Sequence, residues 1–416
     1  MKTSALPLTK EFPALGRKVD GRRMVYLDSA CTALKMRSAA DAQKEFLLEL
    51  GGCGGRRSSH ALAGAVEEKY IAARAAAARF TGAASPGEII FTSGTTDAVN
   101  VFAGAFPFTP KKNEVILSPL EHNSVFLPFY NLAKAGKIKL KVLPLKGLKP
   151  DASALERMLS AKTALVCVTR ASNFFGGVTD FARLAGLAHS AGSLVFADDA
   201  QYAPTHPVRA AASGADALAF SGHKLGAPFG TGVLWVKKTL LGRLEPSKVG
   251  GGVVKSVGIS GTGFKVEYLK DHQGFEAGVQ NYAGAFAMAR AFKTLSELGH
   301  EAIREHMTGL VSYAYERLGD FKEIKVLGEP RDLEQGALIS FVPAGKSFAA
   351  ADLNIFLNTY YKDRFIALRT GRHCADLASL NSGLSGTVRL SFFVYTSKSD
   401  IDDFSRALRE YLSFLR

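Results

Sequence analysis

Between residues 88 and 236 the sequence alternates short apolar runs with longer helix-forming stretches, and this alternation restricts its fold more than any other feature. Strands are expected at 88–92, 115–117, 140–143, 164–168, 194–197, 216–220 and 233–236, and helices at 97–106, 124–135, 152–159 and 180–190. Repeated strand-helix units predict a parallel sheet with right-handed crossovers covering both faces. We therefore expect an α/β fold whose large domain holds a mainly parallel seven-stranded sheet.

Two long predicted helices lie between the large domain and a smaller one. The first, at 283–298, is closed by Gly299, and the second follows at 301–318. Beyond them the pattern predicts strands and helices of an α+β layer, with strands at 324–327, 337–341, 365–368 and 388–394 and helices at 350–360 and 398–415. We predict a large domain over residues 21–299 and a small domain formed by residues 1–20 together with 300–416.

Two glycine-rich stretches interrupt the regular pattern. Residues 51–55 hold four glycines after a predicted helix at 39–50, and the loop continues with Arg56, Arg57 and His60. Such a loop suits an anionic ligand, although solvated loop charges explain it equally well. Residues 250–278 combine glycines with a lack of periodicity, which favours an excursion over the surface, such as a lid or a dimer contact.

Composition excludes several classes of protein. The 416 residues have a mean hydropathy of +0.06, no apolar run reaches spanning length, and the start lacks the apolar core of a signal peptide, so we expect a cytoplasmic protein without a membrane segment. The net charge of +14 is spread over helices, which makes nucleic acid an unlikely partner. The four cysteines are too few and too far apart for a disulfide scaffold or a zinc ribbon, and we expect no metal site.

Polar clusters follow several of the predicted strands, at the sheet edge where ligands collect. Lys224 lies in the loop Ser221-Gly222-His223-Lys224-Leu225, where a lysine amine stands beside hydrogen-bond donors, and it is our candidate for an imine with pyridoxal phosphate (PLP). Thr95 and Thr96 begin a helix and offer hydroxyls and N–H groups to a phosphate. Asp198 is placed at a strand tip to face the ring nitrogen; Asp199 competes for that role, but consecutive side chains diverge.

A second chemical focus is the loop Arg369-Thr370-Gly371-Arg372-His373-Cys374. A thiol flanked by Arg372 and His373 should have a lowered pKa, and the thiolate is the reactive form of cysteine. Cys167, inside an apolar strand, instead fits a buried packing role. Cys374 is therefore the candidate nucleophile.

With these residues assembled, the chain resembles the class V branch of fold-type I PLP enzymes, and within it the Suf-type (group II) cysteine desulfurases and selenocysteine lyases. The similarity runs from Phe12-Pro13 to Asp402. The order and spacing of the motifs carry it: Gly94-Thr95-Thr96, Glu121-His122, Ser172-Asn173, Asp198-Asp199-Ala200-Gln201, Ser221-Gly222-His223-Lys224, Arg369 to Cys374, and Arg389. The Asp-x-Ala-Gln match selects Asp198 over Asp199.

The resemblance implies a homodimer that binds PLP and acts on L-cysteine, with a sulfur-acceptor protein as a further partner. Lys224 would hold the cofactor, and Cys374 would attack the substrate sulfur and carry a persulfide. The remaining roles follow the family's motifs: His122 stacks on the ring and moves protons, Asp198 holds the ring nitrogen, Gln201 bonds the phenolic oxygen, Thr95, Thr96, Ser221 and His223 bind the phosphate, and Arg389, Asn173, Arg369 and His60 bind the substrate.

The chain departs from the family pattern at several positions. Val279 stands where a threonine usually reaches the neighbouring subunit's phosphate, and valine cannot donate a hydrogen bond. Arg56 replaces a common histidine, Asp376 and Leu377 replace the usual residues after the cysteine, and Thr396 replaces an asparagine. Selenocysteine lyase, a class V aminotransferase or epimerase, and a non-catalytic sulfur-protein or RNA-binding scaffold are the alternative functions.

Overall fold

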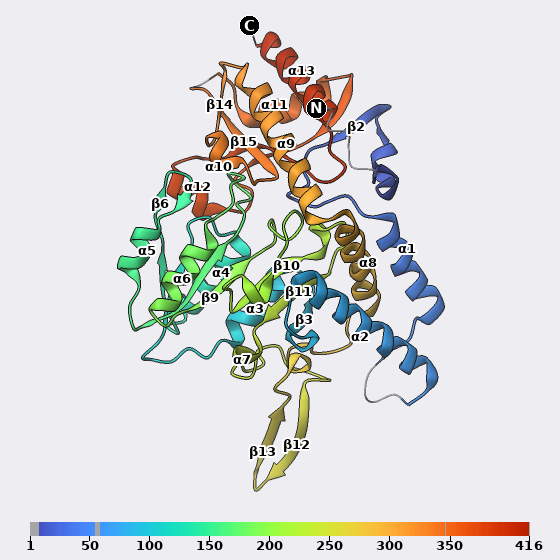
Figure 1. The fold of residues 1–416 in the computed structure, drawn as a ribbon, viewed down its shortest axis with the longest axis vertical. Coiled ribbons are helices and arrows are strands. Elements are labelled where there is room, and N and C mark those ends of the chain that lie inside the picture. Colours follow the sequence, from blue (N-terminus) through green and yellow to red (C-terminus); the bar gives the residue numbers. More distant parts are fainter. Residues whose placement is uncertain (1–7, 55–58, 346, 416) are drawn as a thin grey trace.

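The computed structural model describes residues 8–54, 59–345 and 347–415 (Figure 1). Its centre is a seven-stranded sheet with the order β3-β11-β10-β9-β8-β4-β5. The strands are β3 (Ile89–Thr92), β4 (Glu114–Leu117), β5 (Lys139–Val142), β8 (Thr163–Thr169), β9 (Leu194–Asp198), β10 (Ala217–Ser221) and β11 (Gly232–Val236). Only β11 runs antiparallel to its two neighbours in this sheet. The predicted mainly parallel seven-stranded sheet is confirmed.

Both faces of this sheet are buried, which explains why its strands are continuous apolar runs. Along β10, Leu218 and Phe220 belong to one hydrophobic core, and Ala217 and Ala219 belong to another on the opposite face. The covering helices are α2 (Ala61–Thr81), α3 (Thr95–Ala105), α4 (Asn123–Lys134), α5 (Ala152–Met158), α6 (Phe181–Ser190), α7 (Lys238–Leu241) and α8 (Tyr282–Leu298). The sequence predicted most of these elements to within a few residues.

The helix predicted at 39–50 differs from the observed one. The α-helix α1 (Arg37–Glu45) changes to a π-helical turn, η3 (Phe46–Leu50), before the chain leaves at Gly51 in the left-handed conformation, with φ of 51°. The hydrogen-bond pattern of that last turn is not encoded in the apolar periodicity.

The part of the chain predicted as the small domain lies at the top of Figure 1, around a four-stranded sheet with the order β14-β15-β18-β17. Its elements are α9 (His300–Gly319), β14 (Ile324–Val326), α10 (Pro330–Leu333), β15 (Leu338–Pro343), α11 (Ala350–Ile355), η8 (Phe356–Tyr360), β17 (Arg369–Gly371), α12 (Asp376–Ser382), β18 (Thr387–Ser391) and α13 (Lys398–Phe414). The last turn before Tyr361 is again π-helical. The loop that follows β17 faces the carboxyl edge of the large sheet.

A small sheet joins the start of the chain to its C-terminal part. β2 (Arg22–Tyr26) falls inside the predicted large domain, but it pairs in parallel with β16 (Arg364–Ala367), and β1 (Lys18–Val19) adds to the same small sheet. The pairing joins a segment near the start of the chain to one near its end, and the domain boundary predicted at residue 21 stays a prediction. A parallel partner more than 330 residues away leaves no local signal in the sequence. The boundary at 299 and 300 stays a prediction.

The glycine-rich segment 250–278 contains a hairpin that projects from the body of the molecule (Figure 1). Its strands are β12 (Val254–Ser260) and β13 (Gly263–Tyr268), and most of their side chains are exposed. The predicted excursion over the surface is thus a two-stranded ribbon. Two further short strands, β6 (Leu145–Lys146) and β7 (Lys149–Pro150), pair with each other.

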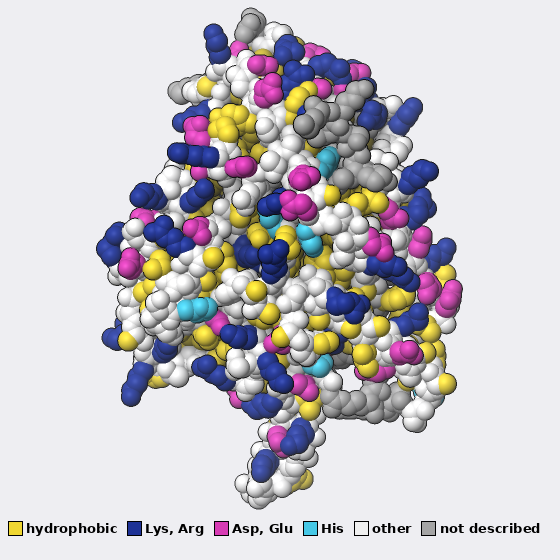
Figure 2. Space-filling model, viewed as in Figure 1, with side chains coloured by type: hydrophobic (Ala, Val, Ile, Leu, Met, Phe, Trp, Pro, Cys, Tyr) yellow, Lys and Arg dark blue, Asp and Glu magenta, His cyan; other side chains and the backbone are white. Residues whose placement is uncertain are grey.

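The net charge of +14 is not gathered in one place on the face of the molecule that Figure 2 draws. On the face drawn in Figure 2, Lys and Arg side chains are interspersed with Asp and Glu over most elements. Across the described ranges, no helix is long and apolar enough to cross a membrane.

Candidate active site

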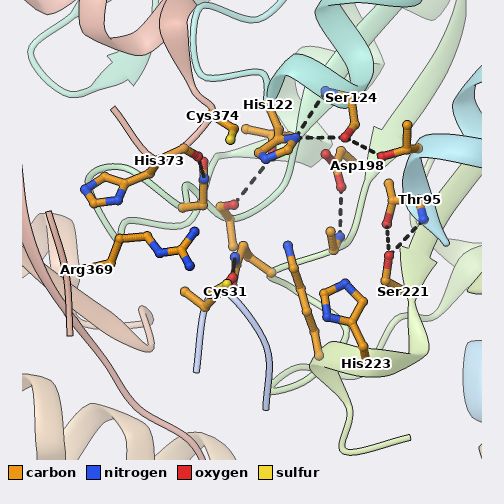
Figure 3. A pocket seen from close by; sticks show the side chains of 18 of the residues that line it. Cys31, Thr95, His122, Ser124, Asp198, Ser221, His223, Arg369, His373 and Cys374 are labelled. Atoms are coloured by element: carbon orange, nitrogen blue, oxygen red, sulfur yellow. Dashed lines mark hydrogen bonds between the residues drawn. The ribbon is translucent and has the colours of Figure 1, made fainter. Parts of the chain in front are cut away.

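A cavity of 160 Å³ opens where the carboxyl ends of β8, β9 and β10 meet the loop after β17 (Figure 3). Of the predicted site residues, all except His60 line it. The lining residues are Ala30, Cys31, Thr95, Thr96, His122, Ser124, Thr169, Ala171, Asn173, Asp198, Ala200, Gln201, Ser221, His223, Lys224, Arg369, His373, Cys374 and Arg389. The topology thus brings together motifs from both predicted domains.

Lys224 and Asp198 form the electrostatic centre of this cavity. Lys224 ends the short helix η6 (Gly222–Lys224) that follows β10, and burial lowers the pKa of its ammonium while the Asp198 carboxylate acts in the opposite direction. Asp198 accepts a hydrogen bond from the Ala200 N–H at 2.8 Å, and burial raises its pKa while Lys224 lowers it. A lysine that loses its proton more easily is a better nucleophile toward an aldehyde.

Asp199 lies outside the cavity. Its Oδ2 accepts a hydrogen bond from Arg170 Nη1 at 2.8 Å, and Arg170 stacks over the Tyr202 ring with its guanidinium carbon 3.7 Å from the ring centroid. Burial raises the pKa of Asp199 to about 6, with Arg170 acting in the opposite direction. Consecutive strand residues point to opposite faces, so only Asp198 of the two faces the cavity.

The start of α3 forms an anion-binding corner. Ser221 Oγ accepts a hydrogen bond from the Thr95 N–H at 2.8 Å and lies 2.7 Å from Thr95 Oγ1. Gly94, at the N-cap, has φ of 145°, and a Cβ at Gly232 would stand 2.6 Å from Gly94 Cα, so β11 can approach only because both residues are glycine. Thr96 Oγ1 is 2.7 Å from Ser124 Oγ. Hydroxyls and the positive end of a helix suit a phosphate.

His122 is held as a neutral imidazole. Its Nδ1 accepts a hydrogen bond from the Ser124 N–H at 3.1 Å, which leaves the ring proton on Nε2. Burial, with the nearby Lys224 and Arg389 charges, lowers the pKa of His122 to about 3. The ring can therefore offer an N–H across the neutral pH range.

Two further predicted residues are fixed by their neighbours. Gln201 Nε2 donates to the Ala30 carbonyl at 2.7 Å, and His223 Nδ1 lies 3.1 Å from Thr32 Oγ1. Burial, with Lys224 and Lys35 as further causes, lowers the pKa of His223 to about 3, so this ring is also neutral.

Arg389 is a buried cation in the wall of the cavity. It lies in the middle of β18 with 2% of its side chain exposed, and its Nη1 donates to the Asn173 carbonyl at 2.9 Å. Its Nη2 pairs with Asp28 at 3.1 Å, and Asp28 also pairs with Arg369 at 3.4 Å. Its Nε is buried without a hydrogen-bond partner among the described residues. A buried guanidinium with a free donor is prepared for an anionic ligand such as a carboxylate.

The Cys374 loop carries local backbone strain. His373 and Cys374 both have left-handed φ angles, 55° and 53°, which non-glycine residues seldom adopt. The Cys374 carbonyl accepts a hydrogen bond from the Asn123 N–H at 2.8 Å, and Asn173 Nδ2 donates to the His373 carbonyl at 2.8 Å. The thiol itself is exposed, and it lies near His122 in Figure 3.

The predicted cationic neighbours of this thiol are directed elsewhere. Arg372 pairs with Asp376 at 3.3 Å. His373 Nε2 lies 2.8 Å from Thr387 Oγ1, and burial lowers the pKa of His373 to about 3, so the ring is neutral. The sequence placed charge beside Cys374 on the basis of adjacency, but Arg372 is paired with Asp376 and the His373 ring is neutral.

His60 is not part of the cavity. It is exposed and caps the N-terminus of α2, where its Nδ1 accepts a hydrogen bond from the Ala63 N–H at 3.1 Å. Arg56 and Arg57, predicted on the same loop, lie outside the described residues.

Sequence reasoning missed three residues here. Cys31 and Ser124 line the cavity, and Asp28 orients two of its arginines. Ser124 could have been found from its position two residues after His122. Cys31 entered the sequence analysis only as one of four scattered cysteines, and no motif pointed to it.

Comparison with known proteins agrees with this geometry. The Aminotransferase class-V family profile matches residues 25–404. A probable cysteine desulfurase of Borreliella burgdorferi is 31% identical over 98% of this chain and 96% of its own length, and one of Halalkalibacterium halodurans is 32% identical over 98% of each. The crystal structure of the Escherichia coli cysteine desulfurase CsdA, in its S-sulfonic acid form, superposes with a TM-score of 0.85 at 32% identity over 98% of each chain. The apo cysteine desulfurase of Thermococcus onnurineus gives 0.86 at 28% identity, over 99% of this chain and 100% of that one.

The chain belongs to the class V aminotransferase family, whose cofactor is PLP. Its relatives at 31–33% identity over at least 94% of both chains place it among the cysteine desulfurases of that family. The resemblance inferred from the sequence motifs is confirmed at this level.

Proposed function

We propose that the protein converts L-cysteine to L-alanine and carries the released sulfur as a persulfide on Cys374. The observation that carries this proposal is one cavity that holds the Lys224 amine, the Asp198 carboxylate, the Arg389 guanidinium and an exposed thiol. An aminotransferase or epimerase has no use for a nucleophilic thiol at this position.

The residues fit PLP. Lys224 would hold its aldehyde, Asp198 its ring nitrogen and Gln201 its phenolic oxygen, with His122 against the ring. Thr95, Thr96 and Ser221 of the anion-binding corner, together with His223, would hold its phosphate. When bound, PLP supplies an electron sink for the carbons of an amino acid.

The protein's own groups would do the following work. Arg389, oriented by Asp28, binds the substrate carboxylate with Asn173 and Arg369 beside it. The Lys224 amine and the Nε2 position of His122 move protons at the substrate. The Cys374 thiolate attacks the substrate sulfur: an S–S bond forms, the C–S bond breaks, and its electron pair stays with the β-carbon, which takes up a proton to give alanine.

A homodimer is supported by the exposed ribbon and an adjoining hollow. One face of the β12–β13 ribbon carries Val257, Ile259, Phe264 and Val266, all exposed. At the ribbon's base lies a hollow of 770 Å³ lined by both polar and apolar groups, next to Val279, which is 78% exposed. A second copy of the chain would cover these apolar side chains.

A sulfur-acceptor protein is the proposed partner of the persulfide, because Cys374 is exposed and can be reached from outside. The four cysteines are free in the described structure, which suits a reducing compartment, and we propose the cytoplasm.

The test is chemical. Purified protein should be yellow and, given L-cysteine and a reductant, should release sulfide and alanine in equal amounts. Turnover of selenocysteine alone would make it a selenocysteine lyase. Amino-group transfer without sulfide would make it an aminotransferase, and a colourless protein that binds no PLP would overturn the proposal.

A further inference from the structure

Glu121 is a buried carboxyl group with no cationic partner. It lies in the loop between β4 and α4, directly before His122, with none of its surface exposed. It is not among the residues that line the cavity, so it stands behind the cavity wall. Throughout the described part of the chain, no Lys, Arg or His forms an ion pair with it. Burying an unpaired carboxylate is costly, and such groups normally take up a proton instead.

The contacts of Glu121 join two parts of the site. Its Oε1 accepts a hydrogen bond from the Thr169 N–H at 2.5 Å. Thr169 ends β8 and stands opposite Asp198 in the parallel register of β8 and β9. The carboxyl group therefore connects the loop that carries His122 to the strand end beside Asp198, although these residues come from different strand-helix units.

The surroundings of Glu121 favour its protonated form. Burial and the neighbouring Asp198 carboxylate raise its pKa well above the usual range, and the Thr169 N–H and the Ser118 hydroxyl only partly oppose this. Its Oε2 makes no well-aligned hydrogen bond within the described ranges. Burial, with Glu121 as a further cause, also raises the pKa of the Cys167 thiol, which lies nearby.

We propose that Glu121 is a positioning residue that acts as an uncharged acid. It connects the His122 loop to the strand end beside Asp198. The negative charge at the ring nitrogen is then carried by Asp198 alone. This inference rests on the proposed function in so far as His122 and Asp198 contact the cofactor. Two carboxylates that share a buried site cannot both ionise without a large cost. A neutral Glu121 gives the connection without that cost.

Two substitutions separate the charge from the connection. In Glu121→Gln the amide oxygen can still accept the Thr169 N–H, and the side chain is neutral. In Glu121→Ala that buried N–H loses its acceptor. We expect PLP affinity of the glutamine variant within about twofold of the parent, and an unchanged pH titration of the bound cofactor's absorbance. The alanine variant should bind PLP roughly tenfold or more weakly, because the Thr169 N–H loses its acceptor and the His122 loop loses its connection to the end of β8.

Glu88 provides a matched control. It is also buried, and its carboxylate accepts hydrogen bonds from Trp235 Nε1 at 3.0 Å and from the Lys238 N–H at 3.1 Å. Glu88→Ala should lower the Tm and leave PLP affinity and the pH titration unchanged. If the two alanine variants had equal effects on all readouts, Glu121 would contribute only to the general stability of the fold and would not position His122.

An infrared difference spectrum of the apoprotein measures whether the Glu121 carboxyl group is protonated. At neutral pH, parent minus Glu121→Gln should show the C=O stretch of a protonated carboxylic acid. A carboxylate band in its place, or PLP binding as weak in Glu121→Gln as in Glu121→Ala, would overturn the proposal. If Glu121→Ala does not fold, the glutamine variant and the infrared measurement still decide. Because that measurement uses apoprotein, its outcome does not depend on whether the proposed reaction is correct.

Discussion

Asp28 and Arg389 form an ion pair of 3.1 Å in the wall of the cavity, although 361 residues separate them in the sequence. The same carboxylate also reaches Arg369 at 3.4 Å, so one acidic residue orients two arginines toward the space where a substrate carboxylate would lie. This arrangement predicts that both the charge and the planar shape of Arg389 matter.

Arg389→Lys should raise the KM for L-cysteine at least tenfold, because a lysine cannot form the bidentate pair and would leave the Asn173 carbonyl with a poorer donor. Steady-state kinetics would measure this change, and kcat should fall less than KM rises. Arg317→Lys, in a half-exposed pair with Asp402, is the control and should change neither parameter. An unchanged KM in Arg389→Lys would remove Arg389 from the substrate site.

Lys224→Ala should abolish the visible absorbance band of lysine-bound PLP, because the lysine that lines the cavity is then missing. The absorbance spectrum of purified protein measures this directly. Lys237→Ala, after β11, should keep the parent spectrum. A band that persists in Lys224→Ala would show that another amine holds the cofactor.

Asp198→Asn should retain PLP but lose most turnover, because removal of one electrostatic stabiliser typically costs about 2.7–4 kcal/mol of barrier. Asp199→Asn should act mainly on stability, since it leaves the buried Arg170 without its carboxylate partner. Measurement of kcat and Tm for both variants separates the two roles. If Asp199→Asn were the more damaging to kcat, the choice of Asp198 would be wrong.

Cys374→Ala should bind PLP and L-cysteine but release no sulfide, because the attacking thiol is gone while Lys224 and Arg389 are intact. Cys31→Ala is the control, because Cys31 lines the same cavity and is a second thiol that could reach the substrate. It should retain most activity. Alkylation followed by peptide mass analysis should locate the persulfide sulfur on Cys374; its presence on Cys31 would transfer the nucleophile's role to that residue.

Buried neutral histidines should make the fold sensitive to acid. Burial lowers the pKa of His206 to about 4, against about 6.5 in the unfolded chain, so below pH 6.5 the unfolded state binds the extra proton and stability falls toward pH 4. The raised pKa of Asp199, about 6, acts in the opposite direction, so the contribution of His206 must be isolated by difference.

His206→Gln should therefore reduce the loss of unfolding free energy between pH 6.5 and 4 by at most about 1.4 kcal/mol per pH unit. Urea denaturation across that range measures the slope. Identical slopes for His206→Gln and the parent would mean that His206 is already able to protonate in the folded state.

The sequence by itself determined the large sheet and most of the site. Apolar runs followed by helical periodicity report local backbone preference and burial, which explains why the strands from β3 to β11 and residues such as Lys224, Asp198 and Thr95 could be predicted. The charged loop around it predicted Cys374, and motif order then predicted Arg389. These features are encoded within short windows of the chain.

Only the tertiary structure decided the rest, because it depends on contacts between distant segments. The pairing of β2 with β16, the cavity position of Cys31 and the ion pairs of Asp28 join residues hundreds of positions apart. The surroundings of Cys374 were predicted from its neighbours in the chain, but in the structure Arg372 pairs with Asp376 and His373 contacts Thr387. His60 carries a polar side chain on a glycine-rich loop, yet its imidazole is used to cap α2. Sequence adjacency fixes which groups are near along the chain, and only the fold fixes which of them face one another.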